Sequence, residues 1–286
     1  MQLTFDHVTH TYQAGSPFQA TAIRDISLTI RDGEFTALIG HTGSGKSTLV
    51  QHMNALLSPT EGRVLLDGQD VNEKGYSKRT LRQRIGLVFQ YAENQLFEET
   101  VAKDIAFGPK NLGLSAEETD ARVREAMERV GLVYGEIADR SPFELSGGQM
   151  RRVAIAGVIA MRPDMLVLDE PAAGLDPLGR QEIMAMIRGF YHAGTTVVMV
   201  SHSMDDVAET ATRIIVMDQG KVTMDGSPED IFADAAKLVS MDLDVPQTCR
   251  LSLALRDTWP DFPMCVRQDE AFLALASRLK GGKPRA

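Results

Sequence analysis

Short apolar runs alternate with longer amphipathic stretches along most of the 286-residue chain. Short apolar runs bounded by polar or turn-forming residues are typical of strands, whereas apolar residues spaced three and four apart are typical of helices. The predicted strands are LTFDHV, FTALI, RVLLD, IGLVF, MLVLD, TVVMVS and RIIVMDQGKVTMD. Helices are predicted between them, notably over residues 116–130 and 178–191. This alternation indicates an α/β core.

Two parts of the chain depart from the alternation. The residues from about 94 to 157 carry several helical patterns and little strand, between IGLVF and MLVLD, which predicts a helical subdomain inserted into the core. The residues from 236 onward combine short helical patterns such as EAFLALASRL with proline-containing breaks and end in a polar tail. We therefore expect a main domain over 1–235 and a small C-terminal appendage over 236–286.

Composition narrows the class of protein. A hydrophobic content of 43% is enough for a substantial core, and the longest apolar run, near VAIAGVIAM, is shorter than the roughly 20 residues that span a bilayer. The start MQLTFDHVTH does not have the pattern of a signal peptide. Cys249 and Cys265 suggest neither a disulfide framework nor a zinc site and fit a reducing cytosol. The formal net charge of -9 disfavours an extended nucleic-acid interface.

The stretch GHTGSGKST, directly after the predicted strand FTALI, fits the phosphate-binding pattern G-x-x-x-x-G-K-[ST]. Glycines allow the backbone N–H groups to point at phosphate oxygens, and the helix predicted over KSTLVQHMNALL directs its positive end at the same anion. Lys46 is placed to reach the β- and γ-phosphates, and the Ser47 hydroxyl to ligate Mg²⁺. The candidate nucleotide-binding residues are Gly40, His41, Thr42, Gly43, Ser44, Gly45, Lys46, Ser47 and Thr48.

A pair of carboxylates follows a second buried strand, MLVLD. Asp169 and Glu170 come at its C-terminal end, where open α/β sheets bind their ligands. Asp169 suits a Mg²⁺ contact through water, and Glu170 is placed to polarise an attacking water. The alternative is an acidic strand end that makes a structural salt bridge.

The segment SPFELSGGQMRR predicts a second phosphate-binding helix start. Ser146 and Gln149 have the spacing of a capping box, and the apolar pattern after them predicts a helix. Gly147 and Gly148 are poor residues for a first helical turn unless bare backbone is needed there, as it is for an anion. A second subunit could therefore close its own SGGQ helix over the first subunit's nucleotide.

Together, GHTGSGKST, LSGGQ, LVLDEP, AGLD at 173–176 and SHS around His202 resemble the ATPase subunit of an ABC transporter, over roughly residues 3–230. The resemblance implies a P-loop ABC ATPase with a mixed-sheet core, an antiparallel β subdomain and an inserted helical subdomain, in which two subunits sandwich two ATP molecules. It also implies that Tyr12 stacks on adenine, that Gln90 contacts the γ-phosphate and Mg²⁺, and that His202 contacts the γ-phosphate next to Glu170.

Within that family, the segment YAENQLFEETVAKDIAFGPKNLG after Gln90 resembles the energy-coupling factor (ECF) transporters. GSPFQATAIRDISL and SPFELSGGQMRRVAIAGVIAM are most similar to the second of the two paralogous ATPases of the vitamin-type module. The implied partners are a paralogous ATPase, a transmembrane coupling protein and a substrate-binding membrane subunit, with the chain bound peripherally at the cytoplasmic face of the cell membrane. Ala172 stands where the family usually has Thr, which leaves both carboxylates intact.

The loop ENQLFEET is unusual for a surface segment, because Leu96 and Phe97 are flanked by Glu93, Glu98 and Glu99. An apolar anchor surrounded by negative charge suits a basic helical segment of the membrane partner. We therefore expect this loop to be the coupling surface, with both apolar side chains buried against the partner and with Glu93, Glu98 or Glu99 paired with arginines of the partner. The alternative is that Leu96 and Phe97 pack under the helical subdomain.

Three other functions remain to be weighed. A cobalt- or nickel-type ECF ATPase, or an importer with a soluble binding protein, would share these motifs. A soluble ABC ATPase of DNA repair or translation typically has a long coiled-coil insertion or two fused cassettes, and this chain has neither. A non-catalytic regulatory module is disfavoured by the intact Glu170 and His202. The nutrient cannot be named from this chain, because that choice lies in another subunit.

Overall fold

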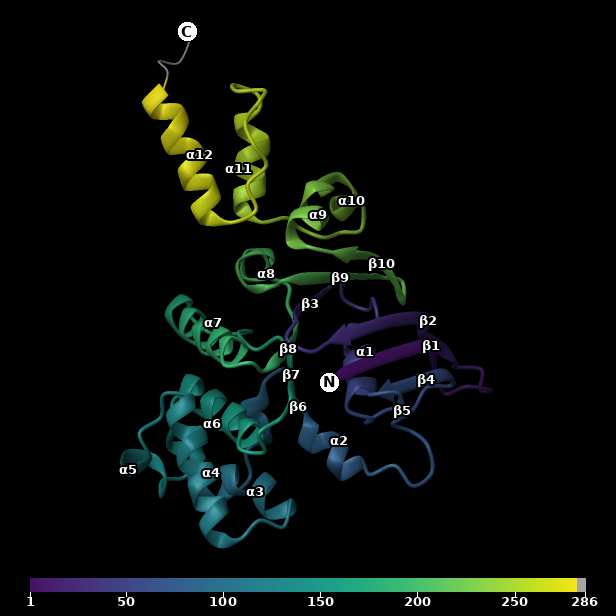
Figure 1. The fold of residues 1–286 in the computed structure, drawn as a ribbon, viewed down its shortest axis with the longest axis vertical. Coiled ribbons are helices and arrows are strands. Elements are labelled where there is room, and N and C mark those ends of the chain that lie inside the picture. Colours follow the sequence, from purple (N-terminus) through teal and green to yellow (C-terminus); the bar gives the residue numbers. More distant parts are fainter. Residues whose placement is uncertain (282–286) are drawn as a thin grey trace.

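The computed structural model describes residues 1–281, and its central element is a six-stranded sheet in the order β10-β9-β3-β8-β7-β6 (Figure 1). Strand β10 pairs antiparallel with β9, and all the other pairings are parallel, so the sheet is mixed as predicted. The strands are β3 (Phe35–Ile39), β6 (Ile85–Val88), β7 (Met165–Asp169), β8 (Thr196–Val200), β9 (Arg213–Asp218) and β10 (Lys221–Gly226).

A second, fully antiparallel sheet has the order β2-β1-β4-β5. Its strands are β1 (Gln2–Tyr12), β2 (Ala20–Arg31), β4 (Glu61–Leu66) and β5 (Gln69–Asp70). The apolar pattern predicted β1 and β4 but not β2 or β5. In β2 the left-handed backbone of Asp25 and the register shifts against β1 interrupt the alternation of buried and exposed residues, so the sequence shows no clean strand pattern there.

Helix α1 (Lys46–Met53) follows the phosphate-binding loop and is shorter than the predicted 46–57, because Ala55 has a left-handed backbone just after it. Helix α7 (Pro177–His192) agrees with the prediction. Two shorter helices, α2 (Lys78–Arg84) and α8 (Met204–Thr210), precede β6 and follow β8. Among residues 1–281, no helix combines the length and apolar character that crossing a bilayer requires.

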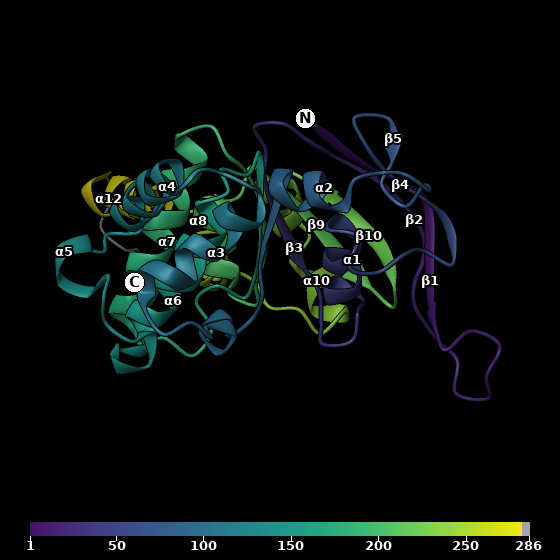
Figure 2. The same ribbon diagram turned by 90° about the horizontal axis from the view of Figure 1, so that it is seen from below.

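Between β6 and β7 the chain is entirely helical in its regular structure, as predicted. The elements are η1 (Ala92–Gln95), α3 (Val101–Asn111), α4 (Ala116–Arg129), α5 (Tyr134–Ile137), η2 (Pro142–Glu144) and α6 (Gly147–Ile159). Figures 1 and 2 show these helices on the side of the molecule away from the four-stranded sheet. Their division into a subdomain with the predicted boundaries stays a prediction.

The C-terminal part consists of α9 (Pro228–Ala233), α10 (Ala235–Ser240), α11 (Gln247–Leu255) and α12 (Gln268–Gly281). Helices α11 and α12 lie side by side and extend from the end of the molecule near β9 and β10 (Figure 1). Both begin against α8, since the backbone N–H groups of Gln247 and Gln268 donate to Asp205 and Glu209 at 2.8 Å. The predicted polar tail falls on residues 282–286, which lie outside the described residues.

Both faces of the six-stranded sheet are buried. In β7, Leu166 and Leu168 join the core shared with the helices, whereas Met165 and Val167 join the core shared with the four-stranded sheet. A strand covered on both faces needs apolar residues at consecutive positions. This explains why β7 reads as an unbroken apolar run until Asp169 and Glu170 emerge at its end.

Candidate functional site

The phosphate-binding loop joins β3 to α1, and two of its glycines are required by close backbone contacts. Gly40 has a φ of 158°, and a Cβ there would lie 2.4 Å from the Met217 carbonyl oxygen. Gly45 has a φ of 104°, and a Cβ there would lie 2.6 Å from the Ala22 carbonyl oxygen. Because Gly45 is also the N-cap of α1 and offers no side-chain cap, the first N–H groups of α1 remain available to an anion.

Lys46 lies buried across its own loop. Its Nζ donates to the carbonyl oxygens of Gly40 and His41, at 2.6 and 3.0 Å. Burial lowers the pKa of Lys46, and the carboxylates of Glu170 and Asp169 oppose that shift. The ammonium group therefore sits between the loop and the two acids at the end of β7, which is the position that a β- and γ-phosphate contact requires.

The two carboxylates at the end of β7 lie in different environments. Burial raises the pKa of Asp169, while the nearby Lys46 and the Ser47 hydroxyl oppose the shift. Burial, and then the charge of Asp169, raise the pKa of Glu170 to about 7. Glu170 also adopts a left-handed backbone, with a φ of 52°, which is uncommon for a residue with a side chain.

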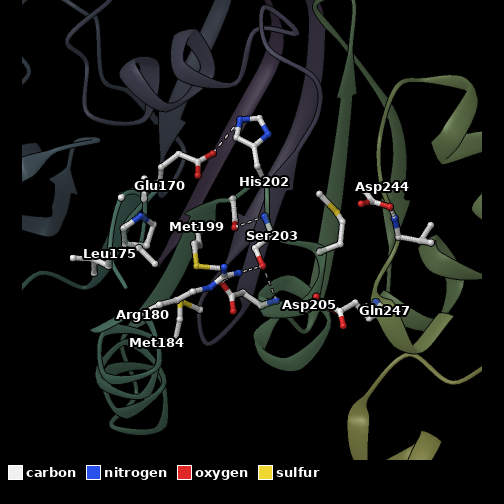
Figure 3. Close-up of a pocket in the computed structure, with 18 of the residues that line it drawn as sticks. Glu170, Leu175, Arg180, Met184, Met199, His202, Ser203, Asp205, Asp244 and Gln247 are labelled. Atoms are coloured by element: carbon white, nitrogen blue, oxygen red, sulfur yellow. Dashed lines mark hydrogen bonds and ion pairs between the residues drawn. The ribbon is translucent and has the colours of Figure 1, made fainter. Parts of the chain in front are cut away.

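His202 comes from the end of β8, the strand that pairs with β7, and its ring faces Glu170 (Figure 3). The Nε2 atom of His202 lies 3.1 Å from Oε1 of Glu170, although the alignment does not make a hydrogen bond. Burial, and then the charge of Lys46, lower the pKa of His202. A carboxyl group whose pKa is about 7, next to a neutral imidazole, can take a proton from a water molecule.

A cavity of about 450 Å³ joins most of the predicted residues. The predicted residues that line it are Thr42, Gly43, Gly45, Lys46, Ser47, Thr48, Gln90, Asp169, Glu170 and His202. Ala22 and Val200 also line it and were missed, because nothing in their residue types signals a ligand. The predicted residues outside this lining are Tyr12, Gly40, His41, Ser44 and the SGGQ residues 146–149.

Tyr12 lies beside the loop rather than in the cavity. Its hydroxyl group is 3.1 Å from the Thr48 hydroxyl oxygen, and its ring packs edge-on against His10. The side chain is 39% exposed, so part of the ring surface remains free at the end of β1. This position, next to the start of α1, is compatible with stacking on the base of a nucleotide whose phosphates lie in the loop.

The SGGQ residues form the predicted capping box at the start of α6. The Gln149 backbone N–H donates to the Ser146 hydroxyl at 3.3 Å, and the Ser146 N–H donates to the Gln149 side chain at 3.1 Å. A Cβ added at Gly147 or at Gly148 would meet nothing within 4 Å in the described chain. The fold of this chain therefore does not itself demand glycine there, unlike at Gly40 and Gly45.

The structure corrects the prediction for the loop ENQLFEET in two respects. Leu96, expected to contact a partner, is only 6% exposed and belongs to the main core, so the alternative interpretation holds for this residue. Glu93, expected to pair with a partner's arginine, pairs instead with Arg151 of this chain. Phe97 does remain 58% exposed, and Glu98 is partly exposed.

Phe97 lies in a groove of about 580 Å³ between η1, α2, α3 and α6. Its ring packs edge-on against Phe107, with ring centroids 5.0 Å apart. Asp104 fixes the loop, since its Oδ2 accepts from the backbone N–H groups of Phe97 and Glu98 at 2.9 Å. The groove is therefore an apolar depression whose rim is held by backbone contacts.

A further cavity of about 470 Å³ adjoins Glu170 on the side of α7, α8 and the C-terminal part (Figure 3). Arg180 crosses it from α7, donating to Asp206 at 2.9 Å and to the Ser203 hydroxyl beside His202. Asp244 and Gln247 face it from the opposite wall (Figure 3). The sequence did not single out Arg180, Asp244 or Gln247, because isolated polar residues carry no pattern that distinguishes them from ordinary surface residues.

The phosphate-binding loop, the paired carboxylates and the mixed sheet define the P-loop class of nucleotide hydrolases. A family model described as ABC transporter matches residues 23–173. The chain is 55% identical to the energy-coupling factor transporter ATP-binding protein EcfA2 of Symbiobacterium thermophilum, over 99% of this chain and 98% of that protein.

The fold is also similar to those of solved ATP-binding cassette structures. With cbiO1 of Clostridium perfringens, described as part of the ABC transporter complex cbiONQ, the TM-score is 0.73 at 37% identity, covering 84% of this chain and 94% of that one. With a dimeric ATP-binding cassette bound to ADP and phosphate, the TM-score is 0.70 at 31% identity, covering 79% and 98%.

The chain belongs to the EcfA2 family of ATP-binding proteins of ECF-type ABC transporters. It is an ATPase subunit of an ECF-type importer, in which ATP hydrolysis is coupled to transport. The predicted resemblance, fold class and activity are thus confirmed, and the DNA-repair, translation and regulatory alternatives are excluded.

Proposed function

We propose that this subunit powers uptake of a vitamin or a similar micronutrient, as one half of a heterodimer with a paralogous ATPase at the cytoplasmic face of the membrane. A transmembrane coupling protein and a substrate-binding membrane subunit complete the transporter. The proposed dimer is supported by Gly147 and Gly148. Glycine is unfavourable in a first helical turn, yet there is open space at both Cβ positions, so nothing in this chain requires glycine there. A phosphate held by the partner's loop accounts for both glycines.

Each site residue then has a role. The phosphate-binding loop holds the ATP phosphates, Tyr12 stacks on adenine, and Gln90 contacts the γ-phosphate. Glu170 takes a proton from the attacking water, and His202 contacts the γ-phosphate beside it. In trans, the Ser146 hydroxyl, the N–H groups of Gly147 and Gly148, and Gln149 close on the ATP of the partner.

Three residues that line the cavity fit a magnesium ion. The Ser47 hydroxyl lies close enough to Asp169 to oppose the rise in the pKa of its carboxyl. Gln90 lines the same cavity. Hydroxyl, carboxylate and amide oxygens are the ligands Mg²⁺ prefers, and few are needed because phosphates and waters supply the rest. Ser47, Gln90 and Asp169 would hold the ion, which would neutralise charge on the phosphates.

The remaining parts follow the predicted division of the chain. Residues 1–235 form the ATPase domain, with the helical insertion at about 94–157 presenting the groove at Phe97 to the coupling protein. Residues 236–286 form an appendage that helps to pair the two ATPases. The exposed apolar side chains Phe272, Leu273 and Leu279 on α12 support the pairing role.

Purification of the tagged chain from membranes, followed by mass spectrometry, tests this proposal. We expect a paralogous ATPase, a coupling protein and a vitamin-binding membrane subunit to co-purify, and Lys46→Ala to keep these partners but abolish uptake. Recovery of a metal-specific membrane subunit instead would replace the vitamin by cobalt or nickel. Recovery of the chain alone would contradict the heteromeric transporter.

A further inference from the structure

Arg151 on α6 joins three segments of the site at one buried point. Its side chain is 3% exposed. Nε and Nη2 donate to the two carboxylate oxygens of Glu93, at 2.9 and 2.6 Å. Nη1 donates to the carbonyl oxygens of Pro171 and Ala173, at 3.0 and 2.7 Å. One guanidinium group therefore connects the SGGQ helix, the segment after Gln90 and the segment after Glu170.

Both connected segments begin with an unfavourable backbone conformation. Glu170 has a φ of 52°, and Tyr91, which follows Gln90, has a φ of 55°. Such conformations in residues with side chains cost about 1 kcal/mol or more, and they persist only where surrounding contacts hold them. Arg151 supplies such contacts on both sides, since it donates to the Pro171 carbonyl just beyond Glu170 and to the Glu93 carboxylate two residues beyond Tyr91.

Two hydrogen bonds hold the backbone of Glu170 itself. Its N–H donates to Val200 of the neighbouring strand at 3.1 Å, and its carbonyl accepts from the Ala173 N–H at 3.1 Å. The first bond ties Glu170 to the sheet, and the second closes the turn from Glu170 to Ala173. The carbonyls of Pro171 and Ala173 point to Arg151, so the guanidinium fixes the orientation of the turn relative to α6.

We propose that Arg151 is a positioning residue for hydrolysis, which holds the turn that aims Glu170 and is itself held by Glu93. The proposal rests on the proposed role of Glu170 as the base. Arg151 touches no reacting atom and acts through the turn. Glu93 belongs to η1 at the edge of the Phe97 groove, and α6 begins at the SGGQ residues. The orientation of the Glu170 side chain therefore depends on the position of the groove and on the position of the SGGQ helix.

The chemistry of arginine suits this role better than a purely stabilising one. A buried ion pair often adds little net stability, because desolvation offsets its Coulombic gain. The planar guanidinium can nevertheless bind a carboxylate with two parallel bonds while its third nitrogen reaches the carbonyls. Lysine keeps the charge but cannot make both sets of bonds, so Arg151→Lys removes the geometry and retains the charge.

The next residue provides a matched control. Arg152 lies on the same helix and also bonds one carbonyl and one carboxylate, donating to Val130 at 2.8 Å and to Glu182 at 2.5 Å. Neither partner belongs to the Gln90 or Glu170 segments. Arg152→Lys therefore imposes the same chemical change on α6 without altering the turn at Glu170.

The experiment uses the full chain assembled with its paralogous partner, whose own catalytic carboxylate is replaced so that only one site turns over. Single-turnover hydrolysis of radiolabelled ATP is measured together with binding of a fluorescent ATP analogue and thermal melting. We expect Arg151→Lys to lower the hydrolysis rate by about 10-fold to 10²-fold, the scale of a small misplacement, with analogue affinity within about 2-fold. Arg152→Lys should change the rate by less than about 2-fold.

A double-mutant cycle separates positioning from general damage to the fold. If Arg151 acts through Glu170, Arg151→Lys has little further effect in a Glu170→Gln background. Glu93→Gln, which leaves the carbonyl bonds in place, should reduce the rate in the same direction but by less. This variant keeps the proposal testable if Arg151→Lys folds poorly.

Two results would overturn the proposal. A wild-type rate in Arg151→Lys and Glu93→Gln would show that the turn after Glu170 keeps its conformation without Arg151. An undiminished effect of Arg151→Lys in the Glu170→Gln background would show that Arg151 acts elsewhere. Both results leave the assigned base intact, whereas a wild-type rate in Glu170→Gln alone would remove the base assignment and the positioning role with it.

Discussion

His202 Nε2 lies 3.1 Å from Glu170 Oε1, across the ends of two adjacent parallel strands. The pairing of β7 with β8 places Asp169 opposite Val200, so the residues that follow each strand meet at the same sheet edge. Burial raises the pKa of the Glu170 carboxyl to about 7 and lowers that of the His202 imidazole. Near neutral pH the Glu170 carboxylate can therefore accept a proton beside the His202 ring.

The first prediction concerns Glu170. Glu170→Gln preserves the size of the side chain but removes the proton acceptor, so turnover should fall by roughly 10²-fold or more while ATP binding remains. ATP that is bound and not hydrolysed should trap the closed dimer with the paralogous subunit. Single-turnover assays and size-exclusion chromatography with ATP measure the two effects. Near-normal hydrolysis with no closed species would show that another group is the base.

The second prediction concerns the start of α6. Ser146→Arg introduces a bulky cation where the partner's phosphate is expected, so hydrolysis at the partner's site should stop. Binding at the mutant's own loop should stay within about 2-fold, because the SGGQ residues do not line the described P-loop cavity. A mixed dimer with one mutated subunit, assayed for site-specific binding and turnover, tests this. Loss of affinity at the mutant's own loop would contradict the sandwich arrangement.

The motifs of the site were predictable from sequence because each is local. GHTGSGKST follows its strand directly, Asp169 and Glu170 end theirs, and Ser146 and Gln149 are three residues apart. In each case the chemistry depends on neighbours along the chain, and the structure confirms the capping box and the position of most loop residues around one cavity.

Features that depend on distant residues were not predictable in the same way. Leu96 and Phe97 are adjacent and similar in polarity, yet Leu96 is buried in the main core whereas Phe97 is 58% exposed. This difference depends on how the segment after η1 packs against the helices, which no apolar period reveals. The pairing of Glu93 with Arg151 joins residues 58 positions apart, and only the packing of η1 against α6 brings them together.

The third prediction concerns stability and His52 on α1. His52 is fully buried, and its Nδ1 donates to the Leu57 carbonyl oxygen at 3.1 Å. Burial, and then the charge of the neighbouring His10, lower the pKa of His52 to about 4, whereas the Leu57 carbonyl opposes the shift. The unfolded chain therefore binds a proton at His52 between about pH 6.5 and 4 that the folded chain does not.

It follows that His52 contributes stability above pH 6.5 that is lost as the pH falls toward 4. Relative to His52→Asn, the wild-type free energy of unfolding should drop by about 2 kcal/mol between pH 7 and pH 5. Urea denaturation at a series of pH values measures this difference. His192→Asn, at an exposed histidine at the end of α7, is the control, and an equal pH slope in all three proteins would contradict the prediction.

The last prediction concerns the coupling surface, now reduced to the part of the loop that the structure leaves exposed. Phe97 offers an apolar side chain in the groove, and Glu98 beside it is partly exposed, so the double change Phe97→Ala with Glu98→Lys alters both shape and charge. Loss of such contacts should weaken association by about 2 kcal/mol or more, roughly 30-fold. Release from membranes and loss of uptake, with ATP-analogue affinity unchanged, are the expected results.

The loop should keep its shape in this variant, because Asp104 binds the backbone N–H groups of Phe97 and Glu98 rather than their side chains. Phe18→Ala with Glu73→Lys is the matched control, since it makes the same two changes at exposed positions in the loops of the four-stranded sheet. Membrane association and transport should survive that control. If both variants remain bound to membranes and transport normally, the coupling protein docks elsewhere and the Phe97 groove serves only the packing of α3 against α6.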